Sequence, residues 1–319
     1  MDITFYSLDF AERHILPSSS RENGYISMTG VKEFRGNGSF QLSFNDDIIK
    51  TFVKAHPEGY FIKWGRFEGY ALDFQFIDAE SKSYIIYGSH LNGLLNNVMF
   101  PPQNITAKTV NSVMSSLIAE NVPWLIYDTF EGDVSVEYVT DKYIEADRFI
   151  EEYFGEAKLG YQVYIKDKTL HFKILPSTTN PLVLSKGNRN VYEIQEDFSN
   201  KDTAHGGWYK KTEEDDGTKL ENEQWVYITS EAKEGIYKRD ILLSATSPGA
   251  ARNELAEHKN KHTTVCKTKN VTYGEDYNLG DVVRLQIDDK TIKKQVSSVD
   301  MWYEGAAYHE EPLLTDWEE

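Results

Sequence analysis

Alternation of hydrophobic and polar positions dominates the first 87 residues. Stretches such as ITFYSLDF, YISMTGVKEF, SFQLSF and YALDFQFI place apolar side chains at every second position, and turns rich in Gly, Asn and Asp separate them. A period of two is typical of strands with one buried face. Short strands spaced roughly 8 to 12 residues apart predict an antiparallel barrel or sandwich.

The pattern changes after the first 90 residues. NITAKTVNSVMSSLIAENV, residues 104–122, places its apolar side chains at helical spacing, with Asn104 or Thr106 as the N-cap. Residues 143–154 predict a second helix. The hairpin GYQVYIKDKTLHFKIL follows, with a KDK turn that lacks glycine. A small α+β segment therefore interrupts the strands.

Strands return in the second half as VYEIQEDF, HGGWYKK, QWVYITS, DVVRLQI and KKQVSSVDMW, with one predicted helix at 251–262. The acidic tract TEEDDGTKLENEQ, residues 212–224, predicts an exposed hairpin tip. The predicted fold class is strand-rich α+β. The expected parts are a first β-barrel-like module at 1–100, an inserted α+β domain at 101–180, a second β-rich module at 181–246, and a helix plus strands completing the barrels at 247–319.

Charge limits the classes of partner. The 319 residues include 34 basic and 51 acidic side chains, a formal charge of −17. Such an excess opposes a grip on nucleic acid, which needs a Lys and Arg footprint, but it suits a surface that DNA passes without sticking. The N-terminus lacks the features of a signal peptide, and no apolar run approaches ~18 residues. We expect synthesis in a cytoplasm and no membrane anchor.

The stretch YGEDYNLGD, residues 273–281, places Glu275, Asp276, Asn278 and Asp281 in nine positions punctuated by Gly274 and Gly280. It fails the calcium-loop pattern, because oxygen ligands do not alternate and the twelfth position counted from Asp276 is Ile287. We interpret it as a connector in which Gly274 and Gly280 turn the chain and Leu279 enters the core before a strand.

Other candidate chemistry is weak. His258, His262 and Cys266 stand at four-residue intervals, which on one helix would form a metal-ligating face, but the β-branched residues 263–265 predict that the helix ends first. No nucleophile elbow, zinc-protease motif or phosphate loop is present in the sequence, and Gly36-Asn37-Gly38 lacks the following helix of a dinucleotide fingerprint. We predict no catalytic residue, cofactor or metal.

Five motifs resemble the Gp37-like family of siphophage tail proteins, relatives of the baseplate hub and of the N-terminal part of tail-associated lysins. They are ITFYSLDF, FRGNGSFQLSF, YIIYGSHLNGLLNNVMFPP, GYQVYIKDKTLHFKIL and YGEDYNLGDVVRL, in that order along nearly the whole chain. The last motif is the most specific. The positions that match the family are Gly36, Gly38, Phe40, Gly88, Pro101, Tyr273, Gly274, Asp276, Tyr277, Leu279, Gly280, Asp281 and Pro312.

The resemblance implies two β-barrel-like modules around an α+β insert, in a protein that acts by assembly in the virion tail tip or baseplate. It implies a homotrimeric ring of six barrels that matches a hexameric distal tail protein and contacts tail-tip or receptor-binding proteins. The ring would close the tail tube and open for the tape-measure protein and DNA. EEPLLTDWEE departs from the family's usual C-terminus, and a chain ending at 319 leaves any wall-degrading activity to another chain.

The competing hypothesis is a cell-wall carbohydrate-binding module or glycoside hydrolase. In that case Trp64, Trp208, Trp225 or Trp302 would be exposed and stack on sugars, whereas packing in a core or interface is the alternative for each. For the tail protein, we hypothesise that the acidic excess gathers on the wall of the lumen.

Overall fold

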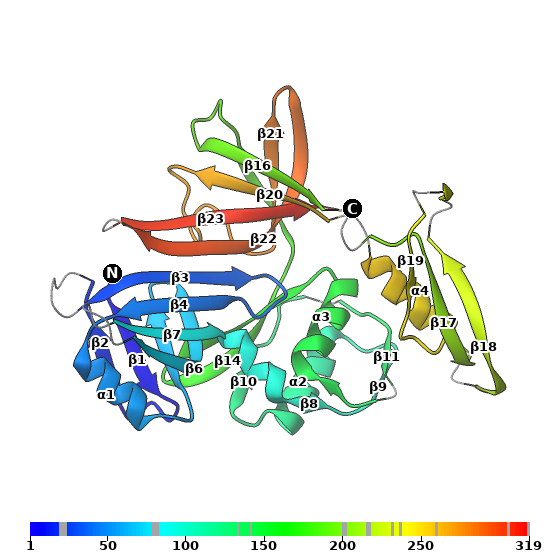
Figure 1. Cartoon of the computed structure of the whole chain (residues 1–319), viewed down its shortest axis with the longest axis horizontal. Helices are drawn as coiled ribbons and strands as arrows, with labels where there is room; N and C mark the ends of the chain where they lie inside the picture. Colours follow the sequence, from blue (N-terminus) through cyan, green and yellow to red (C-terminus); the bar gives the residue numbers. More distant parts are fainter. Residues whose placement is uncertain are drawn as a thin grey trace. The chain divides into compact units, whose positions relative to one another are not determined.

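The computed structural model divides into two compact units, one formed by Met1–Ile194 with Val265–Glu319 and the other by Gln195–Thr264. Strands outnumber helices in both (Figure 1), so the strand-rich α+β class is confirmed. The structure describes residues 1–18, 24–77, 83–132, 134–140, 142–199, 203–214, 218–230, 233–235, 238–258, 261–304 and 307–317.

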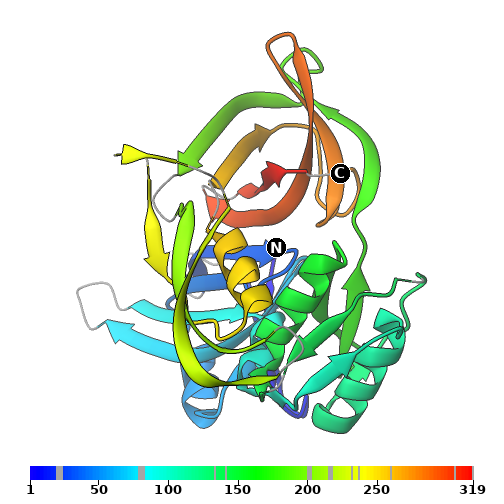
Figure 2. The same ribbon diagram turned by 90° about the vertical axis from the view of Figure 1, so that its right-hand side faces the viewer.

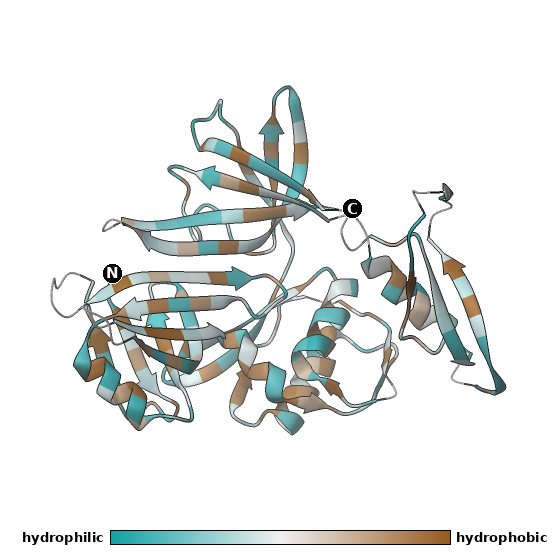
Figure 3. Ribbon diagram, viewed as in Figure 1, coloured by the Kyte–Doolittle hydropathy of each residue, from teal (hydrophilic) through white to brown (hydrophobic). Residues whose placement is uncertain are grey.

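The first module is a curved antiparallel sheet in the order β3-β4-β7-β6-β5-β1-β2. Its strands follow the predicted alternation: on β4 every second residue, Phe40, Leu42 and Phe44, is buried. Figure 3 shows hydrophobic and hydrophilic residues alternating along many of these strands. The elements are β1 (Ile3–Ser7), β2 (Arg13–Leu16), β3 (Tyr25–Glu33), β4 (Ser39–Phe44), α1 (Asp47–Ala55), β5 (Tyr60–Trp64), β6 (Phe67–Ile77) and β7 (Ser83–His90).

Helix α1 corrects the prediction, which had only strands in this stretch. Asp46 caps it by accepting a hydrogen bond of 2.8 Å from the backbone N–H of Ile49. Ile49, Phe52 and Val53 are buried at helical spacing. Three buried apolar residues in a nine-residue helix do not stand out from the surrounding period of two.

The α+β insert packs α2, α3 and the β10-β14-β13 sheet around a second hydrophobic core, to which Phe10 and Phe61 of the first module also contribute. The N-cap of α2 is Thr109 rather than Asn104 or Thr106, because Gln103–Ile105 forms a strand. The KDK turn forms without glycine, because Asp167 and Lys168 both adopt the positive φ that such a tight turn requires. The elements are η1 (Leu91–Asn97), β8 (Met99–Phe100), β9 (Gln103–Ile105), α2 (Val110–Asn121), β10 (Leu125–Tyr127), β11 (Tyr138–Thr140), β12 (Ile144–Glu145), α3 (Ala146–Glu156), β13 (Gly160–Lys166) and β14 (Thr169–Leu175).

The second module is another curved sheet, visible edge-on in Figure 2. Its order is β16-β20-β23-β22, continued by β21, which pairs in parallel with β15. Among the described residues, strand pairing closes neither module into a barrel. The elements are β15 (Thr178–Leu184), β16 (Val191–Ser199), β20 (Lys261–Thr268), β21 (Asp281–Ile287), β22 (Lys290–Glu304) and β23 (Ala307–Asp316).

The second unit is a three-stranded sheet, β18-β17-β19, with one face covered by a helix. The elements are β17 (Gly206–Glu213), β18 (Lys219–Thr229), β19 (Asp240–Leu242) and α4 (Pro248–Glu257). The expected division at residue 246 falls inside this unit, because Ala251 and Leu255 of α4 share a core with Tyr209 and Leu243. Residues 215–217 of the acidic tract lie outside the described residues.

In the described part of the chain, no helix combines the length and apolar character needed to cross a membrane. Cys266, the single cysteine, is fully buried in β20.

Candidate assembly face

Strand β22 joins the two modules of the first unit. It pairs with β3 on one side and with β23 on the other, so one sheet runs across both modules (Figure 1). Residues directly opposed on antiparallel strands point to the same side of a sheet. Met301, Gly30 and Phe40 are opposed on the core side. We call the other side of β23, β22, β3, β4 and β7 the sheet face.

One rung of the sheet face carries aromatic and uncharged polar side chains and ends at an aspartate on the neighbouring strand β6. Trp302 stacks on His309, with ring centroids 5.2 Å apart and planes 15° apart. This contact leaves Trp302 only partly exposed, in packing rather than free for a ligand. The rung runs from β23 to β6 through His309, Trp302, Thr29, Gln41, Tyr87 and Asp73.

The adjacent rung is acidic. Asp300 lies opposite Glu311 and Val31, and Glu33 stands two residues further along β3. Burial raises the pKa of Asp300, Glu33 and Glu311. The negative charge of Asp300 raises the pKa of Glu33 and Glu311 further. At Glu311 the positive charge of Lys267 partly opposes this rise. Neither rung holds a lysine or arginine at these paired positions, so the charge of these positions is negative, although Lys267 of β20 acts on Glu311 from beside the rung.

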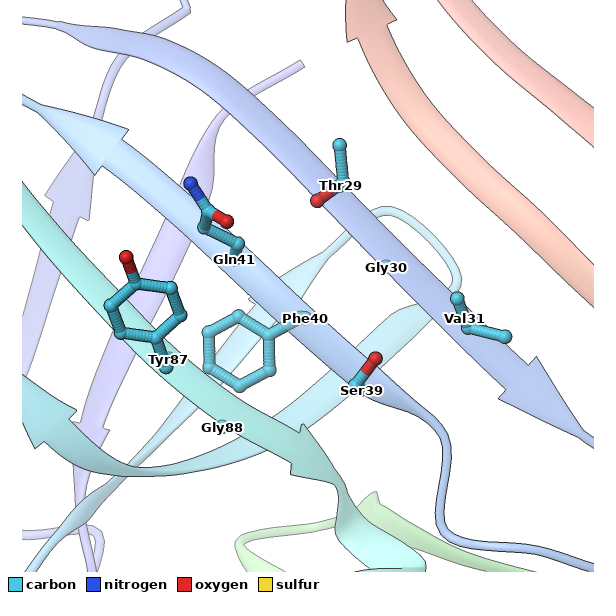
Figure 4. A pocket seen from close by; sticks show the side chains of 8 residues that line it. All are labelled: Thr29, Gly30, Val31, Ser39, Phe40, Gln41, Tyr87 and Gly88. Carbon is cyan, nitrogen blue, oxygen red and sulfur yellow. The ribbon is translucent and has the colours of Figure 1, made fainter.

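A shallow hollow of about 290 Å³ lies on the same sheet, lined by residues of β3, β4 and β7 (Figure 4). The lining includes two of the family-matching positions, Phe40 and Gly88. Gly88 is required because a Cβ there would lie 2.2 Å from the backbone O of Tyr70 and 2.4 Å from the Phe40 ring. The rest of the lining is Thr29, Gly30, Val31, Ser39, Gln41 and Tyr87, all uncharged.

The loop between β3 and β4 accounts for the glycines of the FRGNGSF motif. Gly38 has φ +51°, and a Cβ on it would lie 2.0 Å from the backbone O of Val31. At Gly36 a Cβ would meet the Glu33 carboxylate at 1.8 Å. The glycines thus let the loop turn close to the acidic rung.

Asn92 in η1 clamps three motifs together. Its side-chain Nδ2 donates to the backbone O of Gly36 at 2.8 Å and of Tyr161 at 3.4 Å, while its Oδ1 accepts from the backbone N–H of Val163 at 2.8 Å. The residue is completely buried. One amide therefore ties η1 to the β3–β4 loop and to the hairpin of the insert, which are far apart in sequence.

Glu68 makes a second connection between the first module and the insert. Its Oε2 accepts a hydrogen bond of 2.9 Å from the backbone N–H of Ile165, and its Oε1 accepts one of 2.7 Å from Lys63 Nζ. Neither Asn92 nor Glu68 carried a sequence signal, because their partners are distant in the chain and their neighbours form no chemical motif. Only an unusual polar residue in an apolar stretch, as in HLNGLL, hints at Asn92.

The YGEDYNLGD stretch is a packed turn, as its glycines predict. Gly274 and Gly280 have φ +79° and +87°. The carboxylate of Asp276 accepts from the backbone N–H of Thr272 at 2.8 Å, and that of Asp281 accepts from the N–H of Asn278 at 2.9 Å. These acids hold their own loop, which explains them without a metal.

The same loop connects the two modules. Leu279 is 4% exposed in the core that both modules share, and a Cβ on Gly280 would lie 2.3 Å from the ring of Phe34. Glu275 pairs with Arg66 at 2.9 Å, and Tyr273 accepts the Lys32 ammonium over its ring at 5.4 Å.

The remaining family-matching positions lie in the same unit. Tyr277 is buried with Tyr273, their ring centroids 5.9 Å apart. Pro312 is buried in β23 opposite Val299. Pro101 follows β8, and its backbone O accepts from the side chain of Gln103 at 3.0 Å.

His258, His262 and Cys266 do not share a helix. His258 caps the end of α4, whereas the other two lie in β20, where His262 stacks on Phe198 with centroids 4.0 Å apart. No group of three or more potential metal-ligating side chains occurs in the described ranges of the chain.

Glu151 should make stability depend on pH. Burial, followed by the charges of Asp147 and Glu33, raises its pKa to about 7, against a partial opposing effect of Arg35. The folded state therefore holds a proton that the unfolded state releases near pH 4.5, so this residue's contribution falls as pH rises from about 4.5 to 7. The melting temperature of Glu151→Gln should therefore rise above that of the unsubstituted protein, by a difference that grows as pH increases from about 4.5 to 7. Glu156→Gln, on the same helix, should show no such pH-dependent difference. Parallel melting curves at all pH values would contradict this.

A scan against models of protein families finds no match, and a search of curated proteins also finds none. Solved structures do match. The 43 kDa tail protein of prophage MuSo2 from Shewanella oneidensis aligns over 99% of this chain and 98% of its own, with 13% identity and a TM-score of 0.56. A tail protein from Neisseria meningitidis aligns over 99% and 97%, with 10% identity and a TM-score of 0.57.

This chain has the phage tail-protein fold. Prophage tail protein gp18 from Listeria monocytogenes shares it over 99% of this chain and 95% of its own, with 12% identity and a TM-score of 0.52. The tail-protein fold thus accounts for both units and for the insert, and the resemblance read from the motifs is confirmed at the level of the fold.

Proposed function

We propose that the chain is a structural tail protein, the hub of the tail tip or baseplate of a long-tailed phage or prophage. It acts by assembly, not by catalysis. The main support is that tail proteins share its fold over 99% of its length. In this role the family-matching positions shape the loops and the core, and the protein resides in the virion after synthesis in the host cytoplasm.

The assembly that we propose is a homotrimeric ring. Two strand-rich modules in each chain supply six in three copies, which matches a hexameric distal tail protein on one side and a trimeric tip on the other. The ring closes the tail tube and opens for the tape-measure protein and DNA. Other tail-tip or receptor-binding proteins complete its partners.

We infer that the sheet face lines the lumen of this ring. It spans both modules, and its two rungs hold no lysine or arginine at their paired positions. With a formal charge of −17 per chain, a trimer carries 3 × −17 = −51. A wall with the sign of the DNA backbone repels it and allows it to slide.

The trimer predicts a defined particle. Sedimentation and particle images should show a trimer, or a monomer that becomes a trimer when the distal tail protein is added. An image average with threefold symmetry and a central bore is the expected result. A monomer that ignores the distal tail protein would rule out the hub.

Reversing the acidic rung should turn the lumen into a DNA-binding surface. Glu33→Lys, Asp300→Lys and Glu311→Lys together change the formal charge by +6 per chain, so the assembled ring should retain duplex DNA at low salt, where the unsubstituted ring does not. Retention should weaken steeply with added salt, because counterions are released on binding. The measurement is a gel-shift titration.

A control variant separates position from net charge. Glu120→Lys, Glu131→Lys and Glu156→Lys make the same charge change on exposed residues of the insert. Equal DNA retention by both triple variants would show that the sheet face is not the lumen wall. Melting curves establish that each variant is folded.

A further inference from the structure

The sheet of the second unit has two different faces. Tyr209, Leu243 and the partly buried Val226 and Ile228 point toward α4 and form its core. Residues at the alternate positions of β17, β18 and β19 point away from α4. The register places Trp208 opposite both Tyr227 and Leu242, and Lys210 opposite Trp225, on this second side. We call it the aromatic face.

The aromatic face exposes large rings that a compact unit would normally bury. Trp225 is 60% exposed and Trp208 44%, and Leu242 beside them is 76% exposed. By contrast Trp64, another candidate for sugar stacking, is completely buried. Exposed apolar groups gathered on one side indicate a binding surface.

Gly206 leaves room for a tyrosine ring on this face. A Cβ on Gly206 would lie 2.1 Å from the Oη of Tyr227 and 2.9 Å from the Oδ1 of Asp240. The missing side chain lets the tyrosine ring lie across β17, where its hydroxyl reaches Asp240 at 3.0 Å. The Trp208 ring lies beside it, with centroids 5.1 Å apart.

Charged groups between the rings are paired and balanced. Lys210 pairs with Glu223, and Lys238 pairs with Asp240 at 2.8 Å. Within these two pairs the charges cancel, in a chain of formal charge −17. Except for Asp240, these side chains are about half exposed, so they can still exchange hydrogen bonds with a ligand.

We propose that the aromatic face binds a neutral polysaccharide of a bacterial surface. A pyranose ring offers an apolar C–H side, which stacks on a flat aromatic ring, and a rim of hydroxyls, which bond to paired carboxylates and ammonium groups. A protein partner is disfavoured, because covering two ion pairs costs desolvation and interface cores are depleted in Lys, Glu and Asp. The bacterial source rests on the proposed function, whereas sugar binding itself does not.

The test uses the full chain and defined probes. Hexamers of β-1,4-linked glucose and of β-1,4-linked N-acetylglucosamine, and a purified neutral bacterial wall polysaccharide, are titrated by calorimetry and by tryptophan fluorescence. We expect the wall polysaccharide to bind, and Trp225→Ala and Trp208→Ala each to weaken it by about tenfold, the loss of one aromatic contact. Binding of the hexamers alone would support sugar recognition but overturn the bacterial source.

Trp124→Ala is the matched control, because Trp124 on the insert is as exposed as Trp208 and should leave binding unchanged. The inference is overturned if no probe binds, if both face variants bind like the unsubstituted protein, or if the face captures another tail protein and no sugar. A failed trimer measurement would remove the argument for a bacterial source but not the argument for sugar binding, since this titration needs no ring.

Discussion

Replacing Asn92 with leucine should destabilise the protein by about 3 to 5 kcal/mol. The change removes three hydrogen bonds and leaves the backbone O of Gly36 and the backbone N–H of Val163 buried without that partner. Each orphaned buried group costs about 1 to 3 kcal/mol. Denaturant unfolding of the purified chain measures the loss, and hydrogen exchange should show the strongest loss of protection in the insert hairpin.

Asn96, in the same short helix, provides the control. It is exposed and accepts a hydrogen bond of 2.7 Å from Asn37 at the surface. Asn96→Leu should therefore cost about 1 kcal/mol or less. Similar losses of stability for Asn92→Leu and Asn96→Leu would mean that the buried hydrogen bonds of Asn92 contribute little.

Gly280→Ala should have the second large effect. The residue has φ +87°, and a Cβ would lie 2.3 Å from the Phe34 ring in the core shared by the two modules. Strain at positive φ costs about 1 to 3 kcal/mol, and overpacking a core adds a similar amount. A total loss of about 3 kcal/mol or more in urea unfolding is expected.

Gly235→Ala distinguishes strain from collision. Gly235 also has positive φ, +62°, but a Cβ there meets nothing within 4 Å. Its loss should be about 1 kcal/mol, the conformational part alone. If Gly280→Ala loses no more unfolding free energy than Gly235→Ala, the Gly280 loop does not pack tightly against Phe34. Its proposed role in joining the two modules would then lose support.

The hub proposal concerns the first unit, and the polysaccharide-binding proposal concerns the second. The first unit carries the sheet face and the joints at Asn92 and Gly280, which suit a ring. The second carries the aromatic face, which suits a ligand. The hub test measures particle symmetry and the sugar test measures binding by a single chain, so sugar binding can stand while the hub proposal fails, and the hub can stand while sugar binding fails.

Local patterns were read correctly where neighbours in sequence are also neighbours in space. The alternation of apolar residues placed most strands, and the glycines of YGEDYNLGD indicated a turn, because φ is a property of one residue and its immediate surroundings. The prediction was wrong where a short element interrupts a longer pattern. Helix α1 lies between strands and was not predicted. The short strand Gln103–Ile105 precedes α2, so the N-cap of α2 is Thr109.

Strand class, turn positions, acidic charge and the tail-protein resemblance all follow from the order of the residues, since each depends on composition or on a few adjacent positions. The acidic rung, the Asn92 clamp and the aromatic face do not. Asp300 meets Val31 only through the register of strands that are distant in the chain, and Trp208 meets both Tyr227 and Leu242 only through the register of β17 with β18 and β19. Register is set by which faces are buried together, and that is a property of the folded molecule.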